Sequence, residues 1–235
     1  MPYKVAIIGA ARRHQGTGPY IARHFAKLGH TICGIVGTNQ SSIDNALTQL
    51  SDQFGISSQG YTDFEALIEE QQPDFVAICS PSATHLEYLQ KALANNVHVF
   101  CEKPLYWPDD ENQRMDQHAY EDIINNLLAL ARQKQRYIHL NTQWPYTLKF
   151  FNQIHPEALK SNHIKQFAMH LSPQSQGKKM IIDAGSHGLS MLYALVGEGT
   201  IENIRVKHSG EQNALFDFDY QHSLGCTQTT FGFKA

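Results

Sequence analysis

The sequence lacks a surplus of either charge and any long apolar run. Its 19 Lys and Arg residues nearly balance its 22 Asp and Glu residues, which leaves a formal net charge of −3. Bulk attraction to nucleic acid is therefore not expected. No apolar run approaches the roughly 20 residues that a membrane-spanning helix needs, and no signal-peptide pattern precedes the first strand-like run. We expect a cytoplasmic protein that binds neither nucleic acid nor membrane.

The sequence also lacks paired-cysteine and metal-binding motifs. Its four cysteines are Cys33, Cys79, Cys101 and Cys226. Three of them lie inside or at the end of apolar runs, which is typical of buried free thiols in a reducing compartment. The 13 His residues are scattered, without H-E-x-x-H or a spacing paired with cysteine, so no metal site is expected.

What the first part of the chain does contain is a regular alternation of apolar runs and amphipathic stretches. The apolar runs cover residues 3–9, 31–37, 74–80, 97–101 and 136–141. A further short strand is possible near Gln59–Tyr61. Strands that are apolar throughout and joined by helices indicate a parallel sheet covered on both faces. Right-handed crossovers then predict an α/β, Rossmann-like doubly wound fold.

After about residue 147 the pattern changes. Residues 163–172 alternate like a strand with one solvated face, and residues 180–197 have a helical pattern. Three strand-like stretches with intervening turns follow. We therefore expect a Rossmann-like domain over residues 1–147. A short α+β domain with an antiparallel sheet would cover residues 148–235.

The turn after the first strand has glycines, but not at the usual G-x-G-x-x-G spacing. Gly9 is followed by Gly16 and Gly18, with Arg12 and Arg13 in between. In a doubly wound sheet, ligands bind where the first strand turns into the first helix, and a helix N-terminus favours phosphate. A P-loop is disfavoured because no Lys-Ser/Thr follows the last glycine. The segment is either a dinucleotide-binding loop that is longer than usual or a purely structural turn.

The segment after the second strand bears on the choice of dinucleotide. Folds that prefer NAD usually carry Asp or Glu there to hold the ribose 2′-hydroxyl, whereas residues 37–42 read GTNQSS. A missing acid removes repulsion against a 2′-phosphate, and Thr38 and Ser41 with Arg12 or Arg13 could contact one. The expected cofactor is NAD or NADP, with a slight preference for NADP.

Two later segments are more specific. The stretch NNVHVFCEKP ends on Glu102, Lys103 and Pro104, and DAGSH places Asp183 and His187 four residues apart, on one face of a helix. Together with the first loop, these segments resemble the Gfo/Idh/MocA family of NAD(P)-dependent oxidoreductases. The resemblance covers the first domain nearly end to end and the first helix of the second domain. It implies that residues 1–147 form an NAD(P)-binding domain and that residues 148–235 serve substrate binding or oligomerisation.

The resemblance implies catalytic roles for three residues. Lys103 would lie at the nicotinamide edge and orient the substrate or take part in proton transfer, and Pro104 would follow a cis peptide. His187 would be a general acid/base near the oxygen of the reacting carbon, and Asp183 would bind substrate or hold the histidine. Hydride transfer belongs to the cofactor, while a His or a Lys can move the proton.

The resemblance also implies binding residues. Those expected against the cofactor are Ser80, Pro81, His85 and Glu102. Those expected against the substrate follow the last Rossmann strand and are Asn141, Gln143, Trp144 and Tyr146. These four could stack on and hydrogen-bond a polyol or sugar-like ligand. Equally, Trp144 and Tyr146 could belong to a core between domains.

The first functional hypothesis is an NAD(P)-dependent oxidoreductase acting on a CH–OH group of a hydroxylated, sugar-like small molecule. The alternative is a non-catalytic dinucleotide-binding sensor or partner subunit, which the long glycine loop and the short stretch after His187 favour. The presence of Lys103, Asp183 and His187 together argues against this alternative. Taken singly, Lys103 could be an ordinary exposed lysine, and His187 a polar helix residue capped by Asp183. A methyltransferase-like fold is a third alternative, but it has no use for E-K-P. The chain could form a homo-oligomer.

Overall fold

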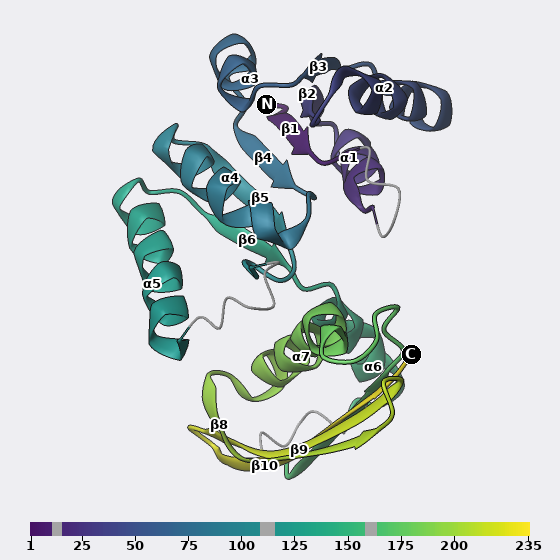
Figure 1. Ribbon diagram of the computed structural model, residues 1–235, viewed down its shortest axis with the longest axis vertical. Helices are drawn as coiled ribbons and strands as arrows, with labels where there is room; N and C mark the ends of the chain where they lie inside the picture. The colour runs from purple at the N-terminus through teal and green to yellow at the C-terminus, as the bar shows by residue number, and fades with distance from the viewer. Residues whose placement is uncertain (11–15, 109–115, 158–163) are drawn as a thin grey trace. The chain divides into compact units, whose positions relative to one another are not determined.

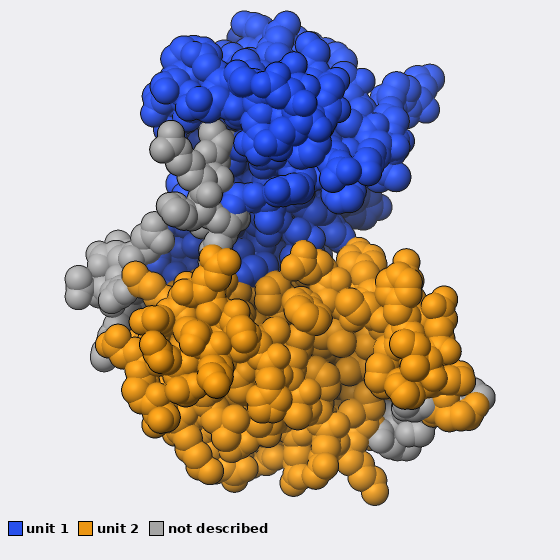
Figure 2. All heavy atoms as spheres, turned by 90° about the vertical axis from the view of Figure 1, so that its right-hand side faces the viewer, with its two compact units in different colours: residues 1–141 blue, residues 142–235 orange. Residues whose placement is uncertain are grey.

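The computed structural model divides into two compact units, Met1–Asn141 and Thr142–Ala235 (Figures 1 and 2). The structure describes residues 1–10, 16–108, 116–157 and 164–235. The division falls just before the expected boundary at residue 147. The roles assigned to the two domains stay predictions.

The first unit alternates strands and helices along the chain. Its strands are β1 (Lys4–Ile8), β2 (Thr31–Val36), β3 (Gln59–Tyr61), β4 (Phe75–Ile78), β5 (His98–Glu102) and β6 (Ile138–Asn141). Its helices are α1 (Gly18–Lys27), α2 (Gln40–Phe54), α3 (Phe64–Gln71), α4 (Ser82–Ala94) and α5 (Gln117–Gln133). The short strand that the sequence suggested is β3.

In the described part of this unit, the six strands form one sheet in the order β3-β2-β1-β4-β5-β6. Every neighbouring pair is parallel. The chain leaves β1 toward β2 and β3, then returns to the other side of β1 with β4. The predicted doubly wound fold is confirmed, and its topological switch point lies between β1 and β4.

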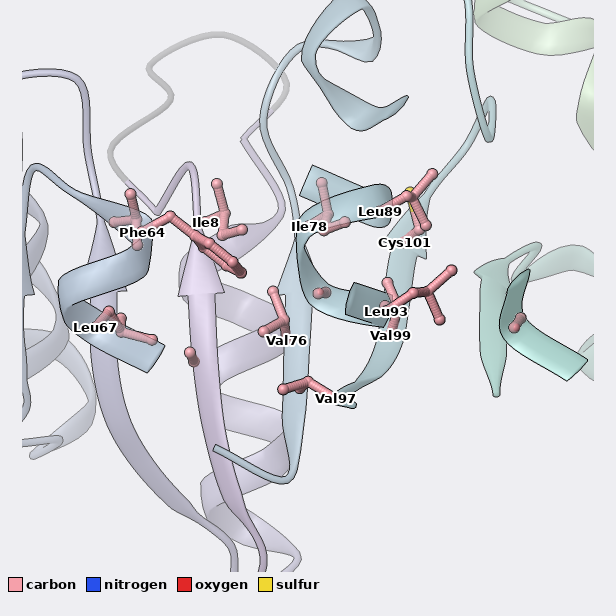
Figure 3. Close-up of a cluster of buried hydrophobic side chains, with 14 of the residues drawn as sticks. Ile8, Phe64, Leu67, Val76, Ile78, Leu89, Leu93, Val97, Val99 and Cys101 are labelled. Atoms are coloured by element: carbon pink, nitrogen blue, oxygen red, sulfur yellow. The ribbon is translucent and has the colours of Figure 1, made fainter. Parts of the chain in front are cut away.

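Strand β1 shows why the strands are apolar throughout. Val5 and Ile7 pack with buried side chains of α1 and α2, whereas Ala6 and Ile8 pack with those of α3, α4 and α5. Figure 3 shows the second of these clusters, with Ile8 beside the buried residues of β4, β5 and the covering helices. Because side chains alternate across a strand, a sheet covered on both faces needs apolar residues at consecutive positions.

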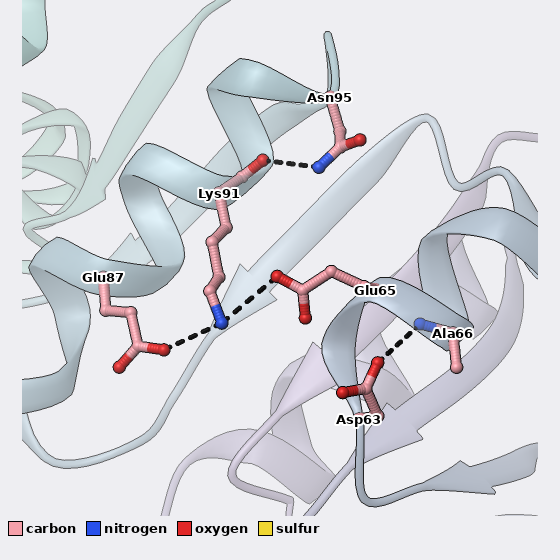
Figure 4. A network of polar contacts seen from close by, with 6 residues as sticks. All are labelled: Asp63, Glu65, Ala66, Glu87, Lys91 and Asn95. Atoms are coloured by element: carbon pink, nitrogen blue, oxygen red, sulfur yellow. Dashed lines mark hydrogen bonds and ion pairs between the residues drawn. The ribbon is translucent and has the colours of Figure 1, made fainter.

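Helices α3 and α4 cover the same face of the sheet and are joined by polar contacts (Figure 4). The Asp63 carboxylate caps α3 by accepting a 2.7 Å hydrogen bond from the Ala66 N–H. Lys91 of α4 pairs with Glu65 of α3 at 3.2 Å and with Glu87 at 2.8 Å. Hydrogen bonds to both carboxylates raise the pKa of Lys91 above its usual value. Exposed pairs of this kind contribute about 0.2–1 kcal/mol to stability.

The second unit contains a smaller sheet and short helices. Its helical segments are η1 (Trp144–Thr147), α6 (Leu148–Ile154), η2 (Ile181–Gly185) and α7 (Ser186–Val196). Its strands are β7 (Gln166–Leu171), β8 (Gly199–Ser209), β9 (Asn213–His222) and β10 (Gly225–Lys234). Among the described helices of the chain, none combines the length and apolar character that crossing a bilayer requires.

This second sheet has the order β7-β10-β9-β8. The last three strands form the predicted antiparallel series, but β7 pairs with β10 in parallel, so the sheet is mixed. Alternation along a strand does not encode its direction, and the β7–β10 pair is joined by a long connection that includes a helix. Parallel neighbours need such crossovers. The sequence pattern therefore could not specify this pair.

Helix α7 packs on one face of the second sheet. Leu192 and Val196 of the helix are buried with Phe218 and Phe231 of β9 and β10. At Gly188 the helix lies close to this sheet, because a Cβ atom there would lie 2.5 Å from the Phe231 ring. The apolar face of α7 and the inward-facing strand residues thus form the core of this unit.

Candidate functional site

The switch point of the first sheet is shaped by glycine. Gly9 follows β1 with a φ of +83°, and a Cβ atom there would lie 2.7 Å from both Cα and N of Ser80, which follows β4. Gly18 opens α1 where a Cβ atom would lie 2.9 Å from the Ala10 Cα. The carboxyl ends of β1 and β4 therefore meet directly, and the first helix starts against the turn. Only glycine fits these two positions without a shift of the backbone.

The N-terminus of α1 is suited to an anion. Its N-cap residue Thr17 makes no side-chain capping bond, Pro19 stands in the first turn, and that turn holds no acidic residue. The backbone amides of a first helical turn and the helix dipole favour a phosphate at such a position. Gly16 precedes the helix and is half-buried. The predicted cofactor residues Arg12 and Arg13 lie outside the described residues.

The segment after β2 leads directly into α2. The Asn39 side chain accepts a 2.9 Å hydrogen bond from the Ser42 N–H and so caps the helix. Thr38 and Ser41 are exposed, and Thr38 Oγ1 accepts a 3.4 Å bond from the Asn39 amide. The exposed hydroxyl groups of Thr38 and Ser41 thus stand at the carboxyl end of the strand next to β1, and residues 37–42 include no carboxylate.

The loop after β4 is held by side chains of the helix that follows it. Ser80 Oγ lies 2.7 Å from Thr84 Oγ1, and Pro81 is the N-cap residue of α4. His85 is 1% exposed. One of its ring nitrogens, Nε2, lies 2.9 Å from the Ser80 carbonyl oxygen, and the other, Nδ1, lies 2.9 Å from that of Pro104. The structure thus brings the predicted residues Ser80 and His85 together.

The E-K-P segment ends β5 beside β6. The peptide bond between Lys103 and Pro104 is cis, which confirms that expectation. Glu102 is paired in register with Asn141, and the Asn141 side-chain amide donates a 2.7 Å hydrogen bond to its carboxylate. Lys103 is half-buried. A residue predicted for the cofactor and one predicted for the substrate therefore meet at one edge of the sheet.

In the second unit, the D-x-G-x-H segment spans a change of helix type. Asp183 lies in the π-helical turn η2 and accepts backbone hydrogen bonds from Gln174 at 3.0 Å and Ser175 at 3.2 Å. His187 lies in the first turn of α7, and its ring centroid is 6.1 Å from that of Trp144. Single π-helical turns are frequent at functional sites. Asp183 anchors a loop, and His187 stands beside a predicted substrate residue.

The other predicted substrate residues of this unit lie in or next to η1. Gln143 and Tyr146 are exposed, Tyr146 to 62%, whereas Trp144 is 36% exposed. The Tyr146 N–H donates a 3.2 Å bond to the Gln143 carbonyl, which closes the helical turn. Two aromatic rings and one amide are thus available on a short, ordered segment.

Sequence reasoning missed residues that position the predicted ones. Thr84 bonds Ser80, and Gly188 lets α7 approach β10 directly after His187. The glycine next to the histidine was a visible signal, since an internal helix glycine often marks close packing. Thr84 had no such signal, because its role depends on the loop that precedes its helix.

A six-stranded parallel sheet in this order, with glycines at its first turn, defines the doubly wound class of nucleotide-binding folds. The sequence model of the Gfo/Idh/MocA family, described as an oxidoreductase family with an NAD-binding Rossmann fold, matches residues 3–123. The chain belongs to this family.

Individual relatives share only modest sequence identity with this chain. An inositol 2-dehydrogenase of Salmonella paratyphi B is 30% identical over 91 residues, which are 38% of this chain and 27% of the relative. A D-glucoside 3-dehydrogenase of Escherichia coli is 25% identical over 211 residues, 86% of this chain and 56% of the relative. The matched segments thus span between about a quarter and about half of these relatives.

The fold as a whole also has a solved counterpart. The crystal structure of myo-inositol 2-dehydrogenase from Lactobacillus plantarum superposes with a TM-score of 0.75. The superposition covers 100% of this chain and 71% of that one at 14% identity. This likeness extends over both units and concerns the fold alone.

Proposed function

We propose that the protein is an NAD(P)-dependent oxidoreductase acting on a CH–OH group of a hydroxylated, sugar-like small molecule. The observation that carries the proposal is the contact of Gly9 with Ser80 at the switch point. This close approach lies beside the N-terminus of α1, whose first turn holds no acidic residue. Membership of a family with an NAD-binding fold supports the same use of this turn.

The residues present fit a dinucleotide. Gly9, Gly16 and Gly18 would let the backbone approach a pyrophosphate at the helix N-terminus. Glu102 would hold the nicotinamide ribose, and Thr38 would meet the adenosine ribose. A bound nicotinamide dinucleotide would supply the hydride donor or acceptor.

The protein itself must accept or supply the proton of the alcohol or carbonyl oxygen. Lys103 and His187 are the groups proposed for this role, because an amine or an imidazole can exchange a proton with the alcohol or carbonyl oxygen. Asp183 holds the loop at Gln174 and Ser175, so we assign it to positioning the substrate or the segment that carries His187.

The proposed substrate is a polyol or a sugar. Sugars present hydroxyl groups and C–H faces, which amide side chains and aromatic rings can bind. Asn141 and Gln143 offer amides, and Trp144 and Tyr146 offer rings. The names of two relatives, an inositol dehydrogenase and a glucoside dehydrogenase, support this class.

Calorimetric titration with NADH and NADPH separately, at one fixed salt concentration, tests cofactor binding. We expect at least one to bind with a dissociation constant of about 1–100 μM, near ordinary cellular cofactor levels. If neither binds, the prediction that the loop after β1 binds a dinucleotide is wrong. The double variant Arg12→Ala with Arg13→Ala should weaken NADPH more than NADH if NADP is the cofactor, and equal losses would contradict that preference.

Turnover tests the catalytic assignment. The oxidation of cyclic polyols and sugars is followed by the absorbance of the reduced cofactor, with Lys103→Ala and His187→Ala compared with the wild type. General acid/base residues contribute about 10²–10⁴-fold, so each variant should lose most activity. Lys27→Ala and His24→Ala, which remove exposed residues of α1, are the matched controls. Retained turnover in both site variants would refute the assignment, and binding without turnover would favour a sensor.

A further inference from the structure

His85 is a polar side chain buried between two loops of the candidate cofactor site. It lies on α4 and is 1% exposed. Its Nε2 atom is 2.9 Å from the carbonyl oxygen of Ser80, which follows β4, and its Nδ1 atom is 2.9 Å from that of Pro104, which follows β5. Strands β4 and β5 are parallel neighbours, so one imidazole ring joins the loops at the carboxyl ends of two adjacent strands.

The chemistry of the contact favours a structural link over ligand binding. A neutral imidazole has one N–H group and donates to one carbonyl, and a protonated ring donates to both. The Cys101 thiol is a further polar group beside the ring, and its sulfur lies 3.5 Å from Nδ1. With both nitrogens facing carbonyls and almost no exposed surface, the ring has little left with which to touch a cofactor.

The contact with Pro104 connects His85 to a residue of the candidate site. Pro104 directly follows Lys103, the group proposed above for proton transfer. The other contact, at Ser80, lies in the loop that Gly9 approaches. Ser80 is itself held by Thr84, which lies in the first turn of α4. The imidazole therefore spans from the loop at the switch point to the turn that carries Lys103.

We propose that His85 is a positioning residue, which fixes the Lys103–Pro104 turn relative to the Ser80 loop and does not itself bind the cofactor. Because Pro104 offers its carbonyl to a ring buried in the unit, the backbone beside Lys103 is held from inside the protein. This inference rests on the proposed function for the role of Lys103, but the contact it invokes is independent of cofactor.

Three substitutions at His85 distinguish its contact with Ser80 from its contact with Pro104. His85→Asn keeps an amide donor near the place of Nδ1, toward Pro104, and His85→Gln keeps one near the place of Nε2, toward Ser80. His85→Ala removes both ring nitrogens. Leu89→Ala is the control, because Leu89 is 0% exposed on the same helix and packs in the apolar cluster. The Leu89 variant shows the effect of destabilising α4 while His85 is kept.

Hydrogen exchange of the full chain without ligands gives the first readout. His85→Ala should speed exchange of the amides in residues 79–84 and 102–107 about tenfold, since a buried carbonyl loses its donor. Exchange in β1 and β2 should not change. His85→Asn should restore the slow exchange of residues 102–107 only. The inference is overturned if His85→Ala leaves both segments unchanged, or if Leu89→Ala speeds them equally.

Turnover gives the second readout. If the wild-type protein is active, His85→Ala should lower kcat about tenfold. The dissociation constant for the dinucleotide should change less than about twofold. His85→Asn should recover more of kcat than His85→Gln. A loss confined to dinucleotide affinity would overturn the positioning role. If the wild type neither binds nor turns over, the proposed function fails, while hydrogen exchange still decides whether His85 holds the turn.

Discussion

The side-chain amide of Asn141 donates a 2.7 Å hydrogen bond to the carboxylate of Glu102. The two residues are partners in the β5–β6 register, each at the last position of its strand. Both are half-buried. The bond therefore orients a carboxylate at the edge of the sheet where the cofactor is proposed to bind, and it leads to the first prediction.

Asn141→Asp would replace this bond by a pair of carboxylates. At such a distance the two negative charges repel, which raises the pKa of the pair in the folded state above the unfolded value. A raised folded pKa means that stability is retained at low pH and lost as the pH rises. Relative to the wild type, the variant should lose about 1–3 kcal/mol at pH ~7 and much less at pH ~4.

Urea unfolding at the two pH values measures this difference. Asn45→Asp, an exposed substitution in α2, is the control for adding one carboxylate. A deficit of the Asn141 variant that stays constant between the two pH values would show that the Asn141–Glu102 contact is not made in solution.

Gly9 and Gly29 offer a matched pair. Their φ angles are +83° and +85°, but a Cβ atom at Gly9 would meet Ser80 at 2.7 Å, whereas one at Gly29 would meet nothing within 4 Å. Both substitutions by Ala should cost about 1 kcal/mol for the left-handed backbone. Gly9→Ala should cost about 1–3 kcal/mol more for the steric conflict, and it should weaken dinucleotide binding. Thermal unfolding and calorimetry check this, and equal losses would contradict the close approach.

Trp144 is proposed to contact substrate beside His187, and it is 36% exposed. Trp144→Ala should raise KM about tenfold with kcat changed less than about threefold, because a stacking contact present throughout the reaction is uniform binding. Its stability should fall by only about 1 kcal/mol. Steady-state kinetics decide this, with Trp107→Ala (42% exposed, in the first unit) as the control. A large loss of kcat with KM unchanged would assign Trp144 to the orientation of His187.

Cys33 gives a prediction on pH. Burial raises the pKa of its thiol from 9.0 to about 11. Because the folded pKa lies above the unfolded one, the thiol stabilises the fold below about pH 9 and loses this contribution as the pH rises toward 11. The free energy of unfolding should therefore fall more steeply over this range in the wild type than in Cys33→Ala. Cys226→Ala, which removes an exposed thiol, should keep the slope of the wild type. Equal slopes in all three proteins would contradict the burial of Cys33.

The fold of the first unit could be predicted because local pattern and global packing agree there. Consecutive apolar residues such as Val5, Ala6, Ile7 and Ile8 require a strand covered on both faces, and this requirement can be read locally. The segments E-K-P and D-x-G-x-H likewise predicted the candidate catalytic residues Lys103, Asp183 and His187. The direction of β7 was not predictable, because strand alternation is the same for both directions.

What the sequence by itself determined are the apolar strands, the glycine-rich first turn and the short motifs that place the chain in its family. Only the tertiary structure decided which of those residues meet. Gly9 contacts Ser80, Glu102 bonds Asn141, and His85 links Ser80 to Pro104 because strands distant in the chain lie side by side in the sheet. Such contacts depend on the order of the strands, and neither composition nor spacing encodes that order residue by residue.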